Sequence, residues 1–300
     1  MTRVGALTYL VRMLTRPPQI VAFGGGGFST EWGNPLLDEH VLALTGVPRP
    51  RVCFLPTASG DADHYIVRFY RAFPSALCDP SHISLFRRET GVGDPRAHLL
   101  AQDLIYVGGG SLISLMGTWR AHGIDATLHE AWRAGVVLCG GSAGSLCWFS
   151  HAVSCFHEGP PRRLEGLGFL PWSNAVHYSD EPGRRSAFLG AVSDGMPPGF
   201  GVGDAAALHF VGTELAEIVS SRPQARARYV FCDGAGDVGE RDLPVRYLGA
   251  TQSGEDLPAG ELVRGSAPAT RLVGDSGLDA RLVGDSRPEA RLAGDSARAA

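Results

Sequence analysis

The sequence predicts an α/β fold: a doubly wound, mainly parallel sheet with helices on both faces. Short apolar runs of strand length alternate with stretches of helical periodicity, which is typical of βαβ units. Three of these runs end in glycine-rich turns, at residues 24–27, 108–110 and 140–144. In an open parallel sheet, ligands bind beyond the carboxyl ends of the strands. We therefore expect the three turns to converge on one crevice.

The first half of the chain supplies the predicted parallel strands and the helices between them. The apolar runs predict strands at residues 20–23, 52–55, 82–86, 104–107 and 136–139. Helices are expected at residues 35–44, 63–73, 112–121 and 124–134, with Pro35 in a first turn and Gly123 between the last two. The second half is richer in strands, which we expect to complete the same domain, at residues 172–176, 206–210, 214–219 and 228–231 and around Val202.

Composition divides the chain into three parts. Residues 1–18 form an N-terminal extension that bears arginine and lacks acidic residues; we interpret it as a surface helix or an upstream start, with a targeting peptide as the alternative. Residues 19–232 form the α/β domain. Residues 233–300 are of low complexity and end in ten-residue repeats of Arg-Leu-Val-Gly-Asp-Ser. The repeats carry too little apolar surface to offset the entropy of ordering, so we expect a disordered tail.

Charge and cysteine content exclude several classes of protein. The net charge of −4 leaves no basic footprint, so no nucleic-acid partner is expected. Because no apolar run is long enough to span a bilayer, we expect no membrane partner and a cytoplasmic location. Two of the six cysteines lie in predicted core strands, which argues against a disulfide framework.

A serine stands at the sharpest of the predicted turns. Ser142 lies in the run Gly-Gly-Ser-Ala-Gly, which follows an apolar strand and precedes a helical stretch. This is the context of a nucleophile elbow, in which the turn lifts the serine Oγ clear of the sheet. The alternative is an ordinary βα turn with a serine that caps the helix.

Histidine is the expected base for this serine, because all 27 basic residues are arginine and lysine mechanisms are excluded. His177 closes a strand-like run and precedes a turn, so it is a candidate base. The oxyanion donors are expected from the Ala143 N–H and from Gly109 or Gly110. Five other histidines are expected on the surface, at positions 40, 64, 98, 122 and 129.

Several motifs in order resemble peptidase family S51, which includes peptidase E (aspartyl dipeptidase) and cyanophycinase. They are the turn at 24–27, Leu-Pro-Thr-Ala-Ser at 55–59, Tyr-Val-Gly-Gly-Gly at 106–110, Gly-Ser-Ala-Gly at 141–144 and Cys-Trp-Phe at 147–149. The resemblance covers residues 19–230 and implies a fold like class I glutamine amidotransferases. It implies Ser142 as nucleophile, His177 as base, and Gly109 or Gly110 with Ala143 as oxyanion donors. Amidotransferases carry cysteine at the elbow, so Ser142 argues against that activity.

The chain departs from the family pattern at three positions. Ser111 stands where the family usually has asparagine, and Ser150 stands where a glutamate commonly follows Trp-Phe. The resemblance also implies an acidic triad member shortly after the serine, where this chain has Cys155 and Phe156. We expect Glu158 to replace it. Asp180 and Asp204 are more distant options.

The altered segment carries a Cys/His pattern of its own. Cys147, His151 and Cys155 are spaced by four and would share one face of a helix, and His157 follows. Four such ligands could bind zinc. Because Cys147 lies in the Cys-Trp-Phe run of the family, we expect it to be packed, and we predict neither a metal nor a cofactor.

The predicted activity is hydrolysis of small peptides by a serine peptidase, as a monomer or homodimer. Arg184 and Arg185 follow His177 and could bind an acidic substrate side chain; a solvated helix start is the alternative. The resemblance to peptidase E implies dipeptides with an N-terminal aspartate as substrates. Two alternatives are a non-catalytic binding protein on the same scaffold, if no acid supports His177, and an esterase.

Overall fold

The computed structural model describes residues 16–87, 91–156 and 159–249, all within one compact unit, Met1–Arg264. Most of the expected N-terminal extension and the ten-residue repeats lie outside the described residues. Among the described residues, no helix is both long and apolar enough to cross a membrane.

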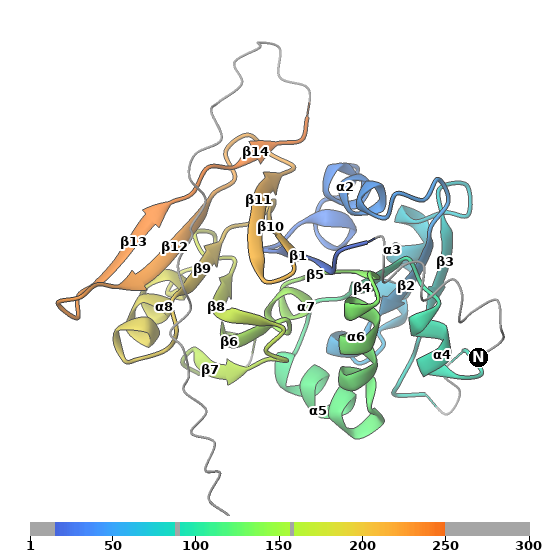
Figure 1. Ribbon diagram of the computed structural model, residues 1–300, viewed down its shortest axis with the longest axis horizontal. Helices are drawn as coiled ribbons and strands as arrows, with labels where there is room; N and C mark the ends of the chain where they lie inside the picture. Colours follow the sequence, from blue (N-terminus) through green and yellow to red (C-terminus); the bar gives the residue numbers. More distant parts are fainter. Residues whose placement is uncertain (1–15, 88–90, 157–158, 250–300) are drawn as a thin grey trace, which may run out of the picture. The chain divides into compact units, whose positions relative to one another are not determined.

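An eight-stranded sheet forms the centre of the fold (Figure 1). Five of its strands are parallel neighbours, in the order β1 (Gln19–Phe23), β5 (Val137–Gly141), β4 (Leu104–Val107), β2 (Arg51–Leu55) and β3 (Asp79–His82). Beyond β1, the sheet continues through antiparallel β10 (Ala206–Val211) and β11 (Glu214–Ser220) and ends at β14 (Arg246–Tyr247). The third strand was expected at residues 82–86 and lies a few residues earlier.

Both faces of this sheet are buried, which confirms the doubly wound α/β prediction. Successive residues of β1 alternate between two apolar clusters, since Ile20 and Ala22 belong to one and Val21 and Phe23 to the other. The first cluster includes side chains of α4 (Pro95–Leu100), α5 (Leu112–His122) and α6 (Ile124–Arg133). The second includes those of α2 (Leu36–Leu44) and α3 (Asp63–Ala72). Strands buried on both sides are apolar throughout, as the sequence indicates.

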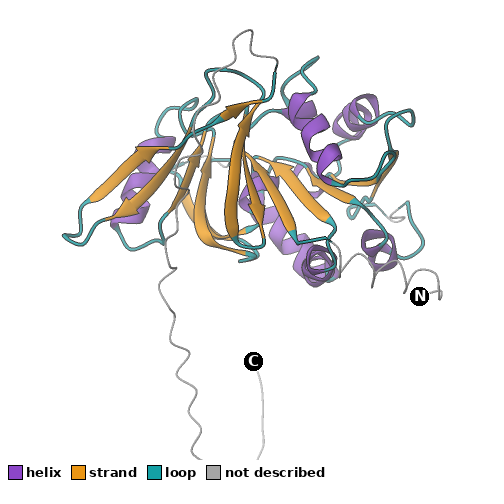
Figure 2. Ribbon diagram, turned by 45° about the horizontal axis from the view of Figure 1, so that its top comes forward, coloured by secondary structure: helices purple, strands orange, loops and turns teal. Residues whose placement is uncertain are grey.

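A second sheet of six strands was not predicted. Its order is β13 (Val238–Asp242), β12 (Ala227–Cys232), β9 (Gly199–Val202), β8 (Leu170–Val176), β6 (Phe149–Ser154) and β7 (Arg162–Glu165). Helix α8 (Arg184–Ser193) packs on it through Phe188 and Val192. The strands expected to complete one sheet therefore divide between two, and Figure 2 shows the helices grouped against both.

The ordered fold continues past the predicted end of the domain. Strand β13 pairs with β12 along its whole length, and β14 pairs with β11. Glu240 also accepts a hydrogen bond from the buried Tyr178 at 2.7 Å. The predicted boundary between domain and tail at residue 233 is therefore wrong, because residues 233–249 supply edge strands to both sheets.

Candidate active site

Ser142 occupies the sharp turn between β5 and α7 (Ala143–Leu146). Its φ of 55° lies in the left-handed region, and its side chain makes no capping hydrogen bond to the helix. The helix-cap alternative is therefore not what the serine does here. A Cβ on Gly144 would lie 2.2 Å from the Val107 carbonyl oxygen, so only glycine permits this approach of α7 to β4. The serine is held in a strained backbone conformation, and strain of this kind is common at active sites.

His177 lies directly beyond β8, on the smaller sheet, and reaches across to Ser142. Its Nε2 is 3.2 Å from the Ser142 Oγ, and its Nδ1 is 2.5 Å from Asp204 Oδ1. Because a carboxylate only accepts, Nδ1 carries the proton toward Asp204 and the Nε2 lone pair faces the hydroxyl. His177 also has a left-handed φ of 52°, and its backbone N–H donates to the Gly24 carbonyl.

Asp204, one of the more distant options, is the carboxylate that the structure brings to His177. Glu158, the expected acid, lies outside the described residues, as does His157. Asp204 belongs to the connection from β9 in one sheet to β10 in the other, and its N–H donates to Asp180 Oδ2 at 2.8 Å. Sequence spacing placed it behind Glu158, because two sheets must meet before this loop reaches the histidine.

The glycine turn after β1 makes room for this pair of side chains. A Cβ on Gly25 would lie 2.1 Å from Asp204 Oδ1 and 2.9 Å from His177 Cε1. A larger residue would therefore displace the contact between the two. The turn at 24–27 thus lets His177 and Asp204 lie close to the backbone, as expected of a glycine-rich turn at a strand end.

The expected oxyanion donors lie on both sides of Ser142. Ala143 is the first residue of α7, and Gly109 lies so close that a Cβ there would be 3.1 Å from the Ser142 Cβ. The Gly109 N–H donates to Tyr65 Oη at 3.1 Å. Gly110 has a φ of 138°, and a Cβ there would meet the Ala58 carbonyl. Of the two glycines, Gly109 is the one that lines the pocket with Ser142.

A polar pocket of about 300 Å³ opens beside Ser142 and His177. Its other lining residues are Gly25, Ser29, Thr30, Ser59, His64, Tyr65, Arg68 and Gly109. His64 was expected on the surface without a role, and although exposed it faces this space. The pocket therefore offers a guanidinium and several hydroxyl groups next to the serine.

Arg68, and not Arg184 or Arg185, is the arginine of this pocket. Arg184 is buried against Glu181, its Nη2 2.6 Å from the carboxylate, and Arg185 pairs with Glu240 at 2.9 Å. Neither lines the pocket that contains Ser142. The prediction for these two residues is corrected, because α8 directs them toward carboxylates of the smaller sheet and its flanking loop.

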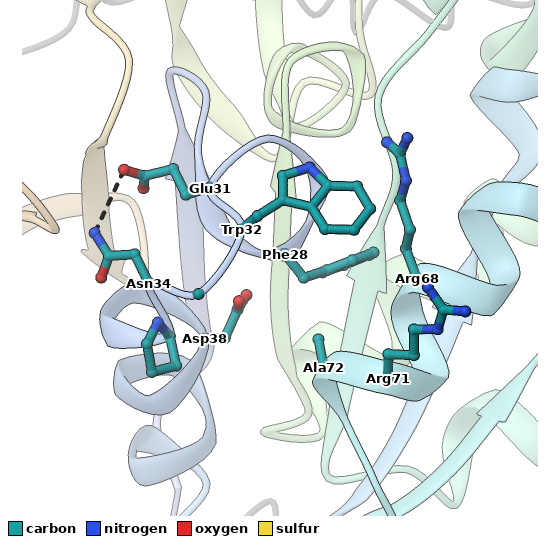
Figure 3. A pocket seen from close by; sticks show the side chains of 10 residues that line it. Phe28, Glu31, Trp32, Asn34, Asp38, Arg68, Arg71 and Ala72 are labelled. Atoms are coloured by element: carbon teal, nitrogen blue, oxygen red, sulfur yellow. Dashed lines mark hydrogen bonds between the residues drawn. The ribbon is translucent and has the colours of Figure 1, made fainter.

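A second pocket of about 380 Å³ adjoins the first and shares Arg68 with it. Figure 3 shows Arg68 and Arg71 on one side, Trp32 and Phe28 in the middle, and Asp38 below Trp32 with its carboxyl group pointing up. The Arg68 guanidinium lies 4.7 Å from the centre of the Trp32 ring. Asp38 is 5% exposed, and burial raises its pKa to about 7.

The Cys/His pattern does not form one helical face. Residues 149–154 are strand β6, so neighbouring side chains alternate between its faces. Cys147 is fully buried, and its Sγ donates to the Gly144 carbonyl at 3.3 Å. His151 Nδ1 contacts Ser150 Oγ at 3.1 Å. The expectation of a packed Cys147 agrees with this placement.

Comparisons with known proteins identify relatives along most of the domain. The chain is 44% identical over 232 residues to the uncharacterized peptidase YgaJ of Bacillus subtilis (strain 168), covering 77% of this chain and 99% of YgaJ. It is 31% identical over 161 residues to peptidase E of Streptomyces coelicolor, a match that covers 52% of this chain and 63% of that protein.

The fold has a solved counterpart as well. A crystal structure of a peptidase from an acI-B1 Actinobacterium matches with a TM-score of 0.56 at 18% identity, over 76% of this chain and 95% of that one. The sequence model of peptidase family S51 matches residues 20–218. A serine elbow with a histidine and a carboxylate behind it, in a chain matched along this span, places the protein in peptidase family S51.

Proposed function

We propose that the protein is a serine peptidase that hydrolyses small peptides with Ser142, His177 and Asp204 as its catalytic triad. The single observation that carries the proposal is the continuous chain of contacts from the Ser142 Oγ to His177 and on to Asp204, at 3.2 and 2.5 Å. A nucleophile, a base within hydrogen-bond reach and a group that orients the base are the three parts that acyl transfer needs.

In the proposed reaction, the Ser142 Oγ attacks the scissile carbonyl carbon while His177 Nε2 takes its proton. The Asp204 carboxylate stabilises the imidazolium that forms and keeps the ring in the correct tautomer. The oxyanion is held by the Ala143 N–H and by Gly109 or Gly110, where a substrate oxygen would share or replace the Tyr65 hydroxyl. His177 then donates its proton to the leaving amine, and water releases the acyl group by the reverse sequence.

We further propose small peptides with an acidic N-terminal residue as the substrates. Support comes from Arg68, which lies in the pocket with Ser142, and from a pocket of about 300 Å³, which suits a substrate of dipeptide size. A guanidinium binds a carboxylate through two parallel hydrogen bonds, so it selects acidic groups. The name of the relative in Streptomyces coelicolor, peptidase E, agrees with this choice.

A panel of dipeptides, Asp-X, Glu-X, Ala-X and Arg-X, tests the proposal. The wild-type protein should hydrolyse Asp-X fastest, and Ser142→Ala should abolish the turnover. Ser186→Ala is the matched control, because this serine is exposed on α8 and its hydroxyl donates to the Gly183 carbonyl just before the same helix. Equal turnover by Ser142→Ala and wild type would refute the proposed nucleophile. Turnover of esters without peptides would indicate an esterase, and no turnover of either would indicate a binding protein.

A further inference from the structure

A cluster of two histidines and one glutamate lies near one end of the larger sheet, apart from the Ser142 pocket. The ligand atoms of His40, His209 and Glu217 all lie within 4.8 Å of one another. None of the three lines the pocket of Ser142. They come from three elements, α2, β10 and β11, so the fold and not local sequence brings them together.

The two strands hold their residues directly opposite each other. His209 and Glu217 are cross-strand partners in the antiparallel pair of β10 and β11, and the register shifts between His209 and Phe210. Such an irregularity re-aims side chains and often marks a functional position. His40 projects from α2, and its side chain is only 11% exposed. The expectation that it lies on the surface is therefore wrong.

In the neutral His209 ring, the hydrogen bond to Gln19 leaves the other ring nitrogen with its lone pair facing a carboxylate. His209 Nε2 is 2.9 Å from the amide oxygen of Gln19, which only accepts, so Nε2 carries the proton of the neutral ring. The unprotonated Nδ1 then faces Glu217 Oε1 at 3.5 Å. His40 Nε2 faces the same oxygen at 3.8 Å and is buried without a hydrogen-bond partner in the described part of the chain.

A proton can bridge only one of these pairs, whereas a metal ion can satisfy all three atoms. Distances of 3.5 and 3.8 Å are longer than good hydrogen bonds. They are close to the edge, about 3.3 Å, of a tetrahedron with metal–ligand bonds of about 2.0–2.1 Å. The other glutamate oxygen, Oε2, accepts a hydrogen bond from Arg246 at 2.6 Å, and Gln19 accepts one from His209 Nε2. Outer partners of this kind orient the ligands of metal sites.

We propose that His40 Nε2, His209 Nδ1 and Glu217 Oε1 bind one divalent transition-metal ion, with zinc the best match, and that water completes the coordination. Two imidazoles and a carboxylate suit Zn²⁺ and its neighbours, whereas Ca²⁺ and Mg²⁺ prefer oxygen alone. Because the ligands join α2 to two strands at the sheet edge, the ion stabilises the folded chain. The site is independent of the peptidase chemistry at Ser142.

A comparison of zinc binding by the wild type and by His40→Leu tests this site without a measurement of enzyme activity. The full-length protein, free of any affinity tag and stripped with a chelator, is titrated with Zn²⁺ while binding and Tm are followed. Wild type should bind one Zn²⁺ per chain and gain Tm. Since His40 Nε2 has no hydrogen-bond partner among the described residues, His40→Leu should fold with an equal or higher metal-free Tm. Its zinc affinity should fall at least about tenfold and its zinc-induced rise in Tm should disappear.

His122→Leu is the matched control, because His122 is exposed near the end of α5 and should leave the zinc response unchanged. Cobalt(II) gives a second readout, since a tetrahedral site produces intense visible absorption that His40→Leu should lose. The proposal is overturned if the wild type takes up no zinc at this stoichiometry. It is also overturned if His40→Leu keeps the wild-type affinity and shift in Tm.

Discussion

At the scale of single residues, Asp204 is the member of the proposed triad that the structure supplies in place of the expected Glu158. Its carboxylate is the described partner of His177 Nδ1, and its own N–H is held by Asp180. Asp204→Asn should lower kcat on the order of 10⁴-fold with the fold intact, because the amide favours the wrong tautomer of the histidine. Asp180→Asn should have a smaller effect, since an amide oxygen still accepts the Asp204 N–H. Steady-state kinetics on an Asp-X dipeptide measures both, and near-normal kcat in Asp204→Asn would exclude this carboxylate.

Arg68 is the residue that should decide substrate preference. Arg68→Gln should lower kcat/KM for Asp-X about 10- to 100-fold, which is the loss expected for one charged hydrogen-bonding partner. Turnover of Ala-X should change little, because an alanine side chain has no charge to bind. Arg71→Gln is the matched control, since Arg71 lines only the neighbouring pocket. An equal loss on both substrates would show that Arg68 does not read the acidic group.

Two members of the proposed triad were predicted from the sequence, and the third was only one of three candidate carboxylates, behind Glu158. The elbow around Ser142 is local, since strand, glycine and serine follow one another directly. His177 follows a strand and so could be placed at a sheet edge. Asp204 required knowledge of two sheets, because it lies on the connection between them. The arginines nearest to His177 in sequence do not line the pocket of Ser142, whereas Arg68, which a different helix supplies, does.

At the scale of elements, helix α2 carries a buried acid that links stability to pH. The pKa of Asp38 is about 7 in the folded protein, raised by burial above its ordinary value of 3.8. The folded state therefore binds the proton more tightly, so this group's contribution is full at low pH and is lost as the pH rises through about 7. Asp38→Asn removes that loss and should add up to about 4 kcal/mol to the free energy of unfolding at about pH 8.

Urea denaturation of both proteins at about pH 4 and about pH 8 measures this effect. The difference between wild type and Asp38→Asn should be small at the lower pH and large at the higher one. A difference that stays constant between the two would mean that Asp38 titrates normally in the folded protein. Glu39 is the next residue of α2 and is exposed, so Glu39→Gln serves as the control.

Strands buried on both faces were predicted more closely than strands at the edges. Parallel strands such as β1, β2 and β4 are continuous apolar runs, and their predicted bounds agree within a residue or so. Strand β3 has the sequence Asp-Pro-Ser-His, which carries no strand pattern and forms only because β2 offers a free edge. The Cys/His segment was considered as one helical face, but its pairing with β7 and β8 makes it strand β6.

At the scale of the whole molecule, the end of the ordered domain lies beyond the predicted boundary. A chain ending at residue 249 should be more stable than one ending at residue 232, because only the longer chain keeps β13, β14 and the Tyr178–Glu240 hydrogen bond. The loss of two edge strands should lower Tm by several degrees, as expected for a change of about 1–3 kcal/mol. Equal melting temperatures would contradict the part assigned to these strands. The composition after Phe231 conceals them, since glycine and charged residues can form edge strands when a neighbour supplies the pairing.

The division into two sheets is also the reason that the candidate active site comes together. Ser142 follows a strand of the larger sheet, His177 follows a strand of the smaller one, and Asp204 connects the two. The alternation of apolar runs and helical stretches predicted the doubly wound fold, and the ordered motifs predicted the family; both are confirmed by the matching relatives and structure. The periodicity of single strands does not indicate which sheet a strand joins, so the meeting of the sheets could not be derived from it.

The most direct test of the account is covalent labelling of the native protein by a fluorophosphonate, followed by mass spectrometry of the intact chain and its peptides. We predict a single adduct on the Ser142 Oγ, formed much more slowly in His177→Ala and absent in Ser142→Ala. A folded wild-type protein that remains unlabelled, or a label that persists in Ser142→Ala, would contradict it.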